Sequence, residues 1–444
     1  MFKSFFADGI FRRILKNFSW LLLGQIFTAI ANFGYLSLTA HSLGLKLFGV
    51  FILTRAYVEV LIGITTFQSW QAFIKYGAVF LKEKDKVSLQ NLIKLTTLLD
   101  ILGSCAGFLV AIALAPYFGP LVGWTPETIR AVQYCSILIL FTLGSTPMGL
   151  LRLYDRFNLL GLQQIVAPSV RLSGTIIALS QEAPFWSYLL VWVSAEALSG
   201  ISLLIIGWLE IRRKGLLENM TLSSSDFKKV DPQIIKFCMV SNLNSSLPLA
   251  MTTSPLVIGL FANPVAVGLF RAGYELATPL KEIALILTQS VYPELAHLSS
   301  RQRWKRFKKI LIRFSFILKG SGAVLLLLGI QFGIPLLYYS MGESFTAAYS
   351  TLILLVIAGV FNMSNYLLEP ALFAMGLPHI SLRVNTISIL FVYVPLLVIL
   401  TSKYAALGAG MATLISNASG FFLNSIFTWR ALQTKINSRK SLPL

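Results

Sequence analysis

The feature that most constrains the fold of this chain is a series of long apolar runs separated by short polar joints. Hydrophobic residues make up 56% of the 444 positions and charged residues only 12%, about half the charged share of an ordinary soluble domain. A helix of about 20 apolar residues crosses the hydrocarbon layer of a bilayer, and it satisfies its own backbone hydrogen bonds there. The sequence therefore predicts an all-α polytopic membrane protein.

The apolar runs and the Gly and Pro residues between them predict twelve transmembrane helices. Residues 1–17 scatter Phe and Ile among basic residues, which indicates an amphipathic cytoplasmic segment lying on the membrane rather than a secretory signal. Residues 430–444 form a basic cytoplasmic tail. The predicted helices are 18–40, 48–70, 93–115, 127–150, 158–180, 185–209, 235–260, 266–292, 312–332, 346–374, 380–400 and 404–429.

The positions of the basic residues along the chain explain the net charge of +19. Of the 37 Lys and Arg residues, 29 lie in the two termini and in every second loop, three lie in the other loops, and five lie within spans. This is the positive-inside pattern, which predicts that both termini are cytoplasmic. The basic surface then meets anionic lipid headgroups, and no nucleic acid is needed to account for it.

A short motif occurs twice, roughly half the chain length apart. Arg55 to Glu59 and Arg271 to Glu275 both read Arg-Ala-x-x-Glu, and both follow Gly-x-Phe. The polar loop 210–234 divides the chain into a six-helix bundle at 18–209 and another at 235–429, with the motif in the second helix of each. Because six is even, both halves enter the membrane in the same orientation. We therefore expect two bundles related by a pseudo-two-fold axis along the membrane normal.

Charged side chains inside spans cost roughly 3 kcal/mol each at the bilayer centre, so they usually mark a pathway or a site. Arginine suits phosphate because its planar group donates paired hydrogen bonds. The candidate substrate-binding residues, which would line a cationic central cavity, are Arg55, Arg271, Lys281, Arg171 and Lys319. The candidate ion-coupling or bracing residues are Glu59, Glu275, Asp100 and Glu196. The alternative is that each Arg–Glu pair only braces packed helices. Arg130 and Glu369 lie near span ends, reach the headgroup layer and are set aside.

Several chemistries lack their usual residues. The chain has no Gly-x-x-x-x-Gly-Lys-Ser/Thr loop for nucleotide phosphates, and no loop large enough to house a transferase site. We therefore expect no catalytic residues. Three cysteines and three histidines lie far apart, so no metal site is predicted, and no cofactor beyond a coupling H⁺ or Na⁺.

Two further stretches strengthen a family resemblance that begins with the six-plus-six helices, the Gly-x-Phe turns and the two arginines. They are residues 67–78 (FQSWQAFIKYGA) and residues 146–157 (TPMGLLRLYDRF). Over nearly its whole length the chain resembles the polysaccharide-transporter branch of the multidrug/oligosaccharidyl-lipid/polysaccharide exporter superfamily, which includes O-antigen and capsule repeat-unit flippases.

The resemblance implies an inner-membrane flippase for undecaprenyl-pyrophosphate-linked oligosaccharides in lipopolysaccharide, capsule or exopolysaccharide biosynthesis. It would work by alternating access, beside glycosyltransferases and a glycan polymerase, with Arg55 and Arg271 meeting the pyrophosphate or acidic sugars. The alternatives are a multidrug or cation antiporter of the same fold, a peptidoglycan-precursor flippase, and a non-transporting scaffold for glycan assembly. The expected arginines lie in the outer parts of their helices, whereas the pyrophosphate starts at the inner face.

Overall fold

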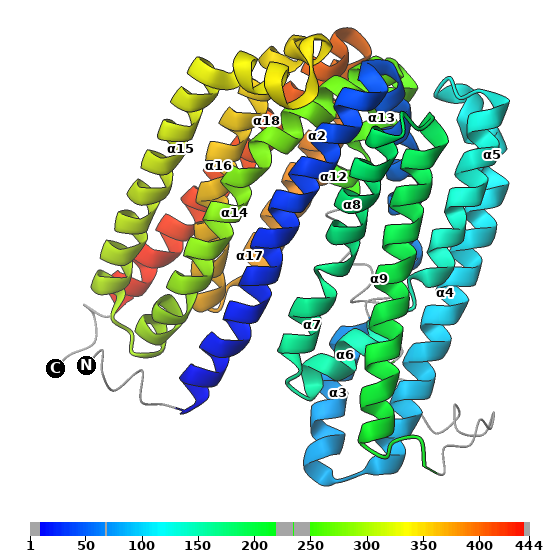
Figure 1. Ribbon diagram of the computed structural model, residues 1–444. Coiled ribbons are helices and arrows are strands. Elements are labelled where there is room, and N and C mark those ends of the chain that lie inside the picture. The colour runs from blue at the N-terminus through cyan, green and yellow to red at the C-terminus, as the bar shows by residue number, and fades with distance from the viewer. Residues whose placement is uncertain (1–8, 67–68, 219–233, 235–248, 439–444) are drawn as a thin grey trace. The chain divides into compact units, whose positions relative to one another are not determined.

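The computed structural model describes residues 9–66, 69–218, 234 and 249–438, with the side chains of 9–23 and of most residues from 279 to 293 outside that description. The described secondary structure is helical, which confirms the predicted fold class. Seven helices or helix groups are long and apolar enough to cross a membrane. Figure 1 gives the order of the helices along the chain.

Close contacts divide the chain into two compact units, which we describe separately. Unit 1 comprises Met1–Leu43 and Thr54–Leu249, and unit 2 comprises Gly44–Leu53 and Ala250–Leu444. The short segment Gly44–Leu53 of the second predicted helix therefore packs with the later half of the sequence. Most of the predicted linker 210–234 lies outside the described residues.

Unit 1 contains most of α2 and the helices up to α9. The first helix, α2 (Gly9–Thr65), is broken at Gly44, whose φ of 67° lies in the left-handed region that favours glycine. The break gives the first two predicted spans. The others are α3 (Ser69–Glu83), α4 (Lys86–Leu121), α5 (Pro126–Cys135), η1 (Ser136–Phe141), α6 (Ser145–Leu153), α7 (Phe157–Gln163), α8 (Val166–Ser180) and α9 (Phe185–Arg213).

Helix α3 was predicted to be loop beyond residue 70. Its residues form one apolar and one polar face, and its buried face consists of Ser69, Ala72, Phe73 and Gly77. A 15-residue amphipathic helix is too short to span the bilayer, so the search for long apolar runs missed it. The turn after it is sharp because Asp85 caps α4 by accepting a hydrogen bond from the Ser88 backbone N–H at 3.0 Å.

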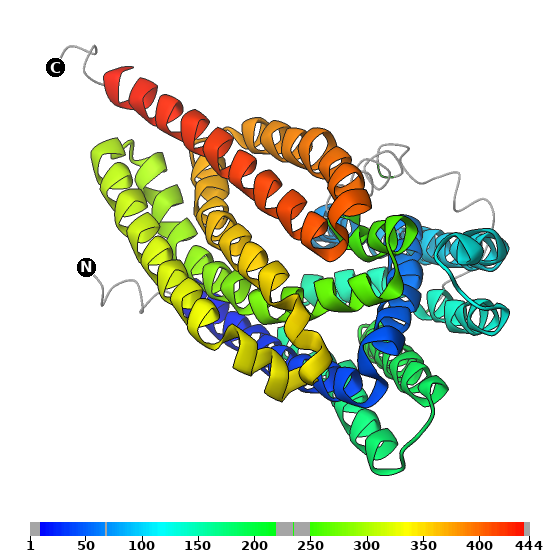
Figure 2. The ribbon, with the colours of Figure 1, turned by 90° about the horizontal axis from the view of Figure 1, so that it is seen from above.

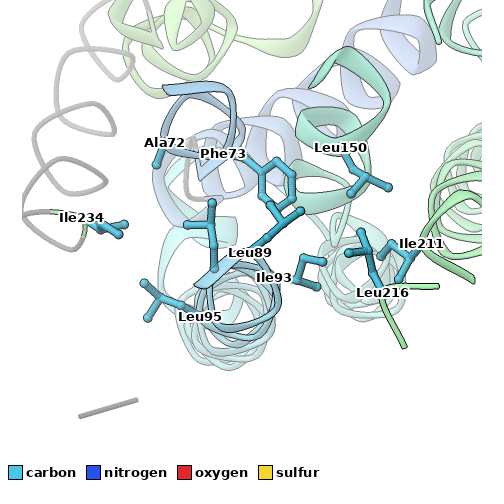
Figure 3. Packing of buried hydrophobic residues seen from close by; sticks show 10 residues of the cluster. Ala72, Phe73, Leu89, Ile93, Leu95, Leu150, Ile211, Leu216 and Ile234 are labelled. Carbon is cyan, nitrogen blue, oxygen red and sulfur yellow. The ribbon is translucent and has the colours of Figure 1, made fainter. Parts of the chain in front are cut away.

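A hydrophobic core binds α3 to its neighbours in unit 1 (Figure 3). Phe73 of α3 lies among Leu89 and Ile93 of α4, Leu150 of α6 and Ile211 of α9, all nearly or fully buried. Burial of each such side chain contributes roughly 1.5–3 kcal/mol. The core therefore holds α3 and α6 against α4 and α9, at the end of unit 1 where Figure 1 labels α3 and α6.

Unit 2 contains the helices after residue 249. Helix α14 packs on α16, and α16 in turn packs on both α15 and α18 (Figure 2). Asn263 caps α14 through the Ala266 N–H at 2.9 Å, and Ala405 interrupts α18 at a φ of 49°. The elements are α12 (Leu249–Thr252), α13 (Ser254–Phe261), α14 (Pro264–Ser300), α15 (Trp304–Met341), η2 (Glu343–Ala348), α16 (Tyr349–Ala374), α17 (Pro378–Thr386), the π-helix η3 (Ile387–Tyr393) and α18 (Val394–Ser438).

The two glycines of the repeated Gly-x-Phe motif meet within unit 2. A methyl group on Gly49 would overlap the Pro264 carbonyl group, and one on Gly268 would lie 2.9 Å from the Leu45 carbonyl oxygen. Gly49 thus faces Pro264, which is four positions before Gly268. In the same way, Gly268 faces Leu45, which is four positions before Gly49. The reciprocal contact gives the motif glycines a packing role, because any side chain at this crossing would push the two helices apart.

Candidate functional site

The first copy of the repeated motif forms an ion pair on one face of α2. Two guanidinium nitrogens of Arg55, Nε and Nη2, lie 3.2 and 2.7 Å from the same Glu59 oxygen, Oε1. The Arg55 side chain is 11% exposed and the Glu59 side chain 44%. The arginine is therefore the buried member of the pair, and the carboxylate is the accessible one.

A second ion pair belongs to the same unit. Arg171 on α8 places Nη2 3.5 Å from Oε1 of Glu196 on α9. Here too the arginine is 11% exposed and the glutamate is the more open partner at 36%. Two helices that adjoin in the sequence thus repeat the arrangement seen within α2.

Aromatic rings cover both guanidinium groups. Arg55 Cζ lies 5.6 Å from the ring centre of Trp192 on α9, and Arg171 Cζ lies 5.7 Å from that of Tyr35 on α2. Both rings are almost completely buried. Contacts within about 6 Å stabilise a cation by roughly 0.5–2 kcal/mol, so the rings lower the cost of holding the arginines in an apolar unit.

The two ion pairs form one electrostatic group, the unit 1 charge cluster of Arg55, Glu59, Arg171 and Glu196. Arg55 interacts with Glu196 as well as Glu59, and Arg171 with Glu59 as well as Glu196. The cluster has no net charge. Its guanidinium groups lie beneath the rings of Tyr35 and Trp192, while its carboxylates are the more exposed members of the pairs.

The second copy of the motif, in unit 2, reverses these exposures. Arg271 Nη2 pairs with Glu275 Oε1 on α14, with the arginine 25% exposed and the glutamate 10%. The guanidinium lies 5.6 Å from the Tyr274 ring, and its Nε is buried without an acceptor in the described part of unit 2. In this copy the arginine, rather than the carboxylate, is therefore the more exposed partner.

Of the other predicted site residues, the structure describes the surroundings of Asp100 and Lys319. Asp100 on α4 is 3% exposed and accepts hydrogen bonds from the Ser69 hydroxyl and from the backbone N–H and hydroxyl of Thr146. Lys319 is exposed on α15, with Nζ 5.2 Å from the Phe421 ring centre. Lys281 belongs to α14, but its side chain is outside the description.

Sequence reasoning missed the rings of Tyr35 and Trp192, because an aromatic residue in an apolar span reads as ordinary core or as an interfacial anchor. It also missed Glu210, which is 4% exposed at the end of α9 and pairs with Arg156. An acidic residue within a run of basic ones was the available signal. Within the described residues, no group of three His, Cys, Asp or Glu side chains is placed to hold a metal ion.

The described part of the chain is all-helical and holds seven helices or helix groups long and apolar enough to span a bilayer, which defines a multi-pass membrane protein. The chain belongs to the polysaccharide biosynthesis protein family, whose profile matches residues 14–299. This match confirms the family resemblance predicted from the sequence.

Individual proteins resemble this chain in sequence or in fold. The inner membrane protein YghQ of Escherichia coli (strain K12) is 26% identical over 349 residues, which cover 78% of this chain and 98% of that protein. A multidrug resistance MATE family transporter of the MOP superfamily matches with a TM-score of 0.72 at 14% identity, covering 94% of this chain and 96% of its own. The lipid II flippase MurJ matches with a TM-score of 0.70 at 14% identity, covering 93% and 89%.

Proposed function

We propose that this protein moves undecaprenyl-pyrophosphate-linked oligosaccharides across the bacterial inner membrane by alternating access. The lipid-linked unit would serve lipopolysaccharide, capsule or exopolysaccharide biosynthesis, with glycosyltransferases before it and a glycan polymerase after it. The family and the flippase fold support a lipid-linked glycan as cargo. The positive-inside pattern supports cytoplasmic termini.

The observation that carries the proposal is the burial of Arg55 and Arg171 beneath aromatic rings in one unit. A guanidinium group remains charged in such surroundings and donates paired hydrogen bonds to phosphate oxygens. The accessible glutamates hold the guanidinium groups until an anion arrives, and then take up H⁺ or Na⁺. A transporter of anionic lipids needs such charges, whereas a passive scaffold has no use for their cost in the bilayer.

A charge exchange tests whether Arg55 and Glu59 bind cargo or only brace α2. Arg55→Gln, Glu59→Gln and the exchange Arg55→Glu with Glu59→Arg are expressed in a strain lacking the chromosomal copy. We expect Arg55→Gln and the exchange to lower surface glycan at least tenfold, because a lost charge-assisted hydrogen bond costs roughly 1.5–3 kcal/mol. Surface glycan is measured against membrane protein level, with Arg130→Gln, at an exposed position on α5, as the control.

Normal glycan display in the exchange variant would show that the pair is a brace, since a brace keeps its attraction when its charges trade places. It would remove Arg55 from the binding site.

Cation antiport is the second candidate, because Glu59 and Glu196 are the more exposed partners in unit 1. An antiporter for cationic drugs binds its cargo through such carboxylates. Ethidium efflux from cells that express the chain separates the two functions. Efflux that is lost in Glu59→Gln but kept in Arg55→Gln supports the antiporter, and absence of efflux beside intact glycan export supports the flippase.

A further inference from the structure

The two stretches that first indicated the family pack against each other in unit 1. Helix α3 includes Trp70 and Phe73 from the first stretch, and α6 includes Gly149 from the second. A methyl group on Gly149 would lie 2.8 Å from Phe73 Cβ and 3.1 Å from Trp70 Cα. The glycine therefore allows the two helices to approach closely, and Phe73 of α3 and Leu150 of α6 both belong to the core drawn in Figure 3.

This close approach places Arg152, in the last turn of α6, on the face of Trp70. Arg152 Cζ lies 4.2 Å from the centre of the Trp70 ring, a stacking distance, and both side chains are half-buried. Within the part of the chain that the structure describes, Arg152 has no carboxylate partner. The stacking holds the guanidinium plane on the ring, and no described carboxylate pairs with it.

Arg156, four residues later, has the opposite environment. Its Nε donates to Glu210 Oε1 at 3.0 Å, and the buried Glu210 also lies 3.8 Å from Arg213 Nη1. Burial, with the nearby Glu210 charge, raises the pKa of the Tyr154 phenol. Among the described ion pairs, Arg156 at this turn pairs with a carboxylate and Arg152 does not.

The surroundings of the turn are basic. Lys214 Nζ lies 4.7 Å from the Tyr154 ring, and Arg212 and Arg213 are exposed at the end of α9. The positive-inside pattern predicts the cytoplasmic face for this end of unit 1. A lipid diphosphate that has not yet crossed the membrane would approach from that side.

We propose that Arg152, stacked on Trp70, binds the diphosphate headgroup of an isoprenoid lipid at this end of unit 1. Stacking leaves the N–H edge of the guanidinium free to donate two parallel hydrogen bonds to phosphate oxygens. The site is separate from the unit 1 charge cluster and would receive the headgroup first. Only the identity of the lipid rests on the proposed function.

Binding of radiolabelled farnesyl diphosphate to the full-length protein in phosphatidylcholine nanodiscs tests the site. We expect Arg152→Gln to weaken binding about tenfold or more, and Arg152→Lys to weaken it less, because lysine keeps the charge but loses the planar fork. Trp70→Leu weakens binding, while Trp70→Phe retains most of it. The matched control is Arg212→Gln, at an exposed position without a stacking ring, with an expected change of less than about twofold.

Competition and the variants together decide the proposal. If inorganic diphosphate displaces the bound farnesyl diphosphate better than phosphatidylglycerol does, the result supports a diphosphate site. Equal displacement by phosphatidylglycerol overturns the proposal in favour of an ordinary phospholipid site. Unchanged binding in Arg152→Gln, or equal losses in Arg152→Gln and Arg212→Gln, also overturns it. If thermal unfolding shows that Arg152→Gln is not folded, binding to Arg152→Lys and to Trp70→Leu decides the proposal instead.

The test is independent of the proposed function. Arg152-dependent binding together with normal surface glycan in the strain that lacks the chromosomal copy would overturn glycan export and leave this site standing. Loss of surface glycan in that strain together with unchanged binding in Arg152→Gln would overturn this site and leave glycan export standing.

Discussion

At the scale of single residues, the charges of this protein differ in what surrounds them rather than in type. Arg55 and Arg171 are paired and covered by rings, and Arg156 pairs with a buried glutamate. Arg152 is stacked on a ring and pairs with no carboxylate that the structure describes. Spacing along α2 predicted the Arg55–Glu59 pair, because residues four apart share a helix face. The partners of Arg171 and Arg152 lie on other helices, so only packing could identify them.

Asp100 gives a prediction at this scale. Its carboxylate accepts three hydrogen bonds that join the start of α3 and the start of α6 to α4. Asp100→Asn replaces one acceptor oxygen with an N–H₂ group, which leaves a buried donor opposite another donor. We expect a loss of about 1–3 kcal/mol in the free energy of unfolding, measured by equilibrium unfolding in mixed micelles.

The matched control is Asp85→Asn, at the partly exposed cap of α4. Asparagine caps a helix about as well as aspartate, so little change is expected there. Unchanged stability in Asp100→Asn would indicate a neutral carboxyl group at position 100, a form that asparagine imitates, and would return Asp100 to the proton-coupling candidates.

At the scale of elements, the sequence located the apolar helices well and the amphipathic and interrupted ones poorly. It predicted a single fourth span at 127–150, but this region consists of α5, the 3₁₀ turn η1 and α6. Prolines led to the opposite error, because two helices were predicted to end before Pro116 and Pro335. In the structure, α4 continues past Pro116 and α15 past Pro335. Neighbouring helices can satisfy the freed carbonyl groups in a membrane protein, so proline marks a helix end less reliably there.

The glycine crossing gives the prediction at this scale. Gly49→Ala places a methyl group on the Pro264 carbonyl group, so we expect a loss of about 1–3 kcal/mol or failure to fold, and a smaller loss for Gly268→Ala. Gly320→Ala on α15 is the control, because nothing lies within 4 Å of its added methyl group. Alanine there should stabilise the helix by about 0.5–1 kcal/mol.

Thermal unfolding of the purified Gly49→Ala, Gly268→Ala and Gly320→Ala proteins measures the order of their stabilities. Equal stability of Gly49→Ala and Gly320→Ala would contradict the close crossing, and the repeated Gly-x-Phe would then require an explanation other than packing.

At the scale of the whole molecule, charge distribution predicts the topology. Residues 116–126, at the end of α4 and in the turn after it, include no Lys or Arg, whereas Arg212, Arg213 and Lys214 are consecutive at the end of α9. Alkaline phosphatase fused after Gly123 should be active, because this enzyme needs the oxidising periplasm, and the same fusion after Lys214 should be inactive. A green fluorescent protein fused after Leu444 should fluoresce.

An active phosphatase fusion after Lys214 would reverse the predicted orientation. It would also place the Arg152 site on the face from which an unflipped lipid cannot arrive.

The sequence alone determined the class of this protein, its helical spans and its family, because hydropathy and loop charge act locally and can be read residue by residue. It also singled out Arg55, Glu59, Arg171 and Glu196 as costly charges within spans. Only the tertiary structure decided that these four residues form one cluster under Tyr35 and Trp192, and that Arg152 stacks on Trp70. The physical reason is that a buried charge is stabilised by whatever packing brings to it, and those groups come from distant parts of the chain.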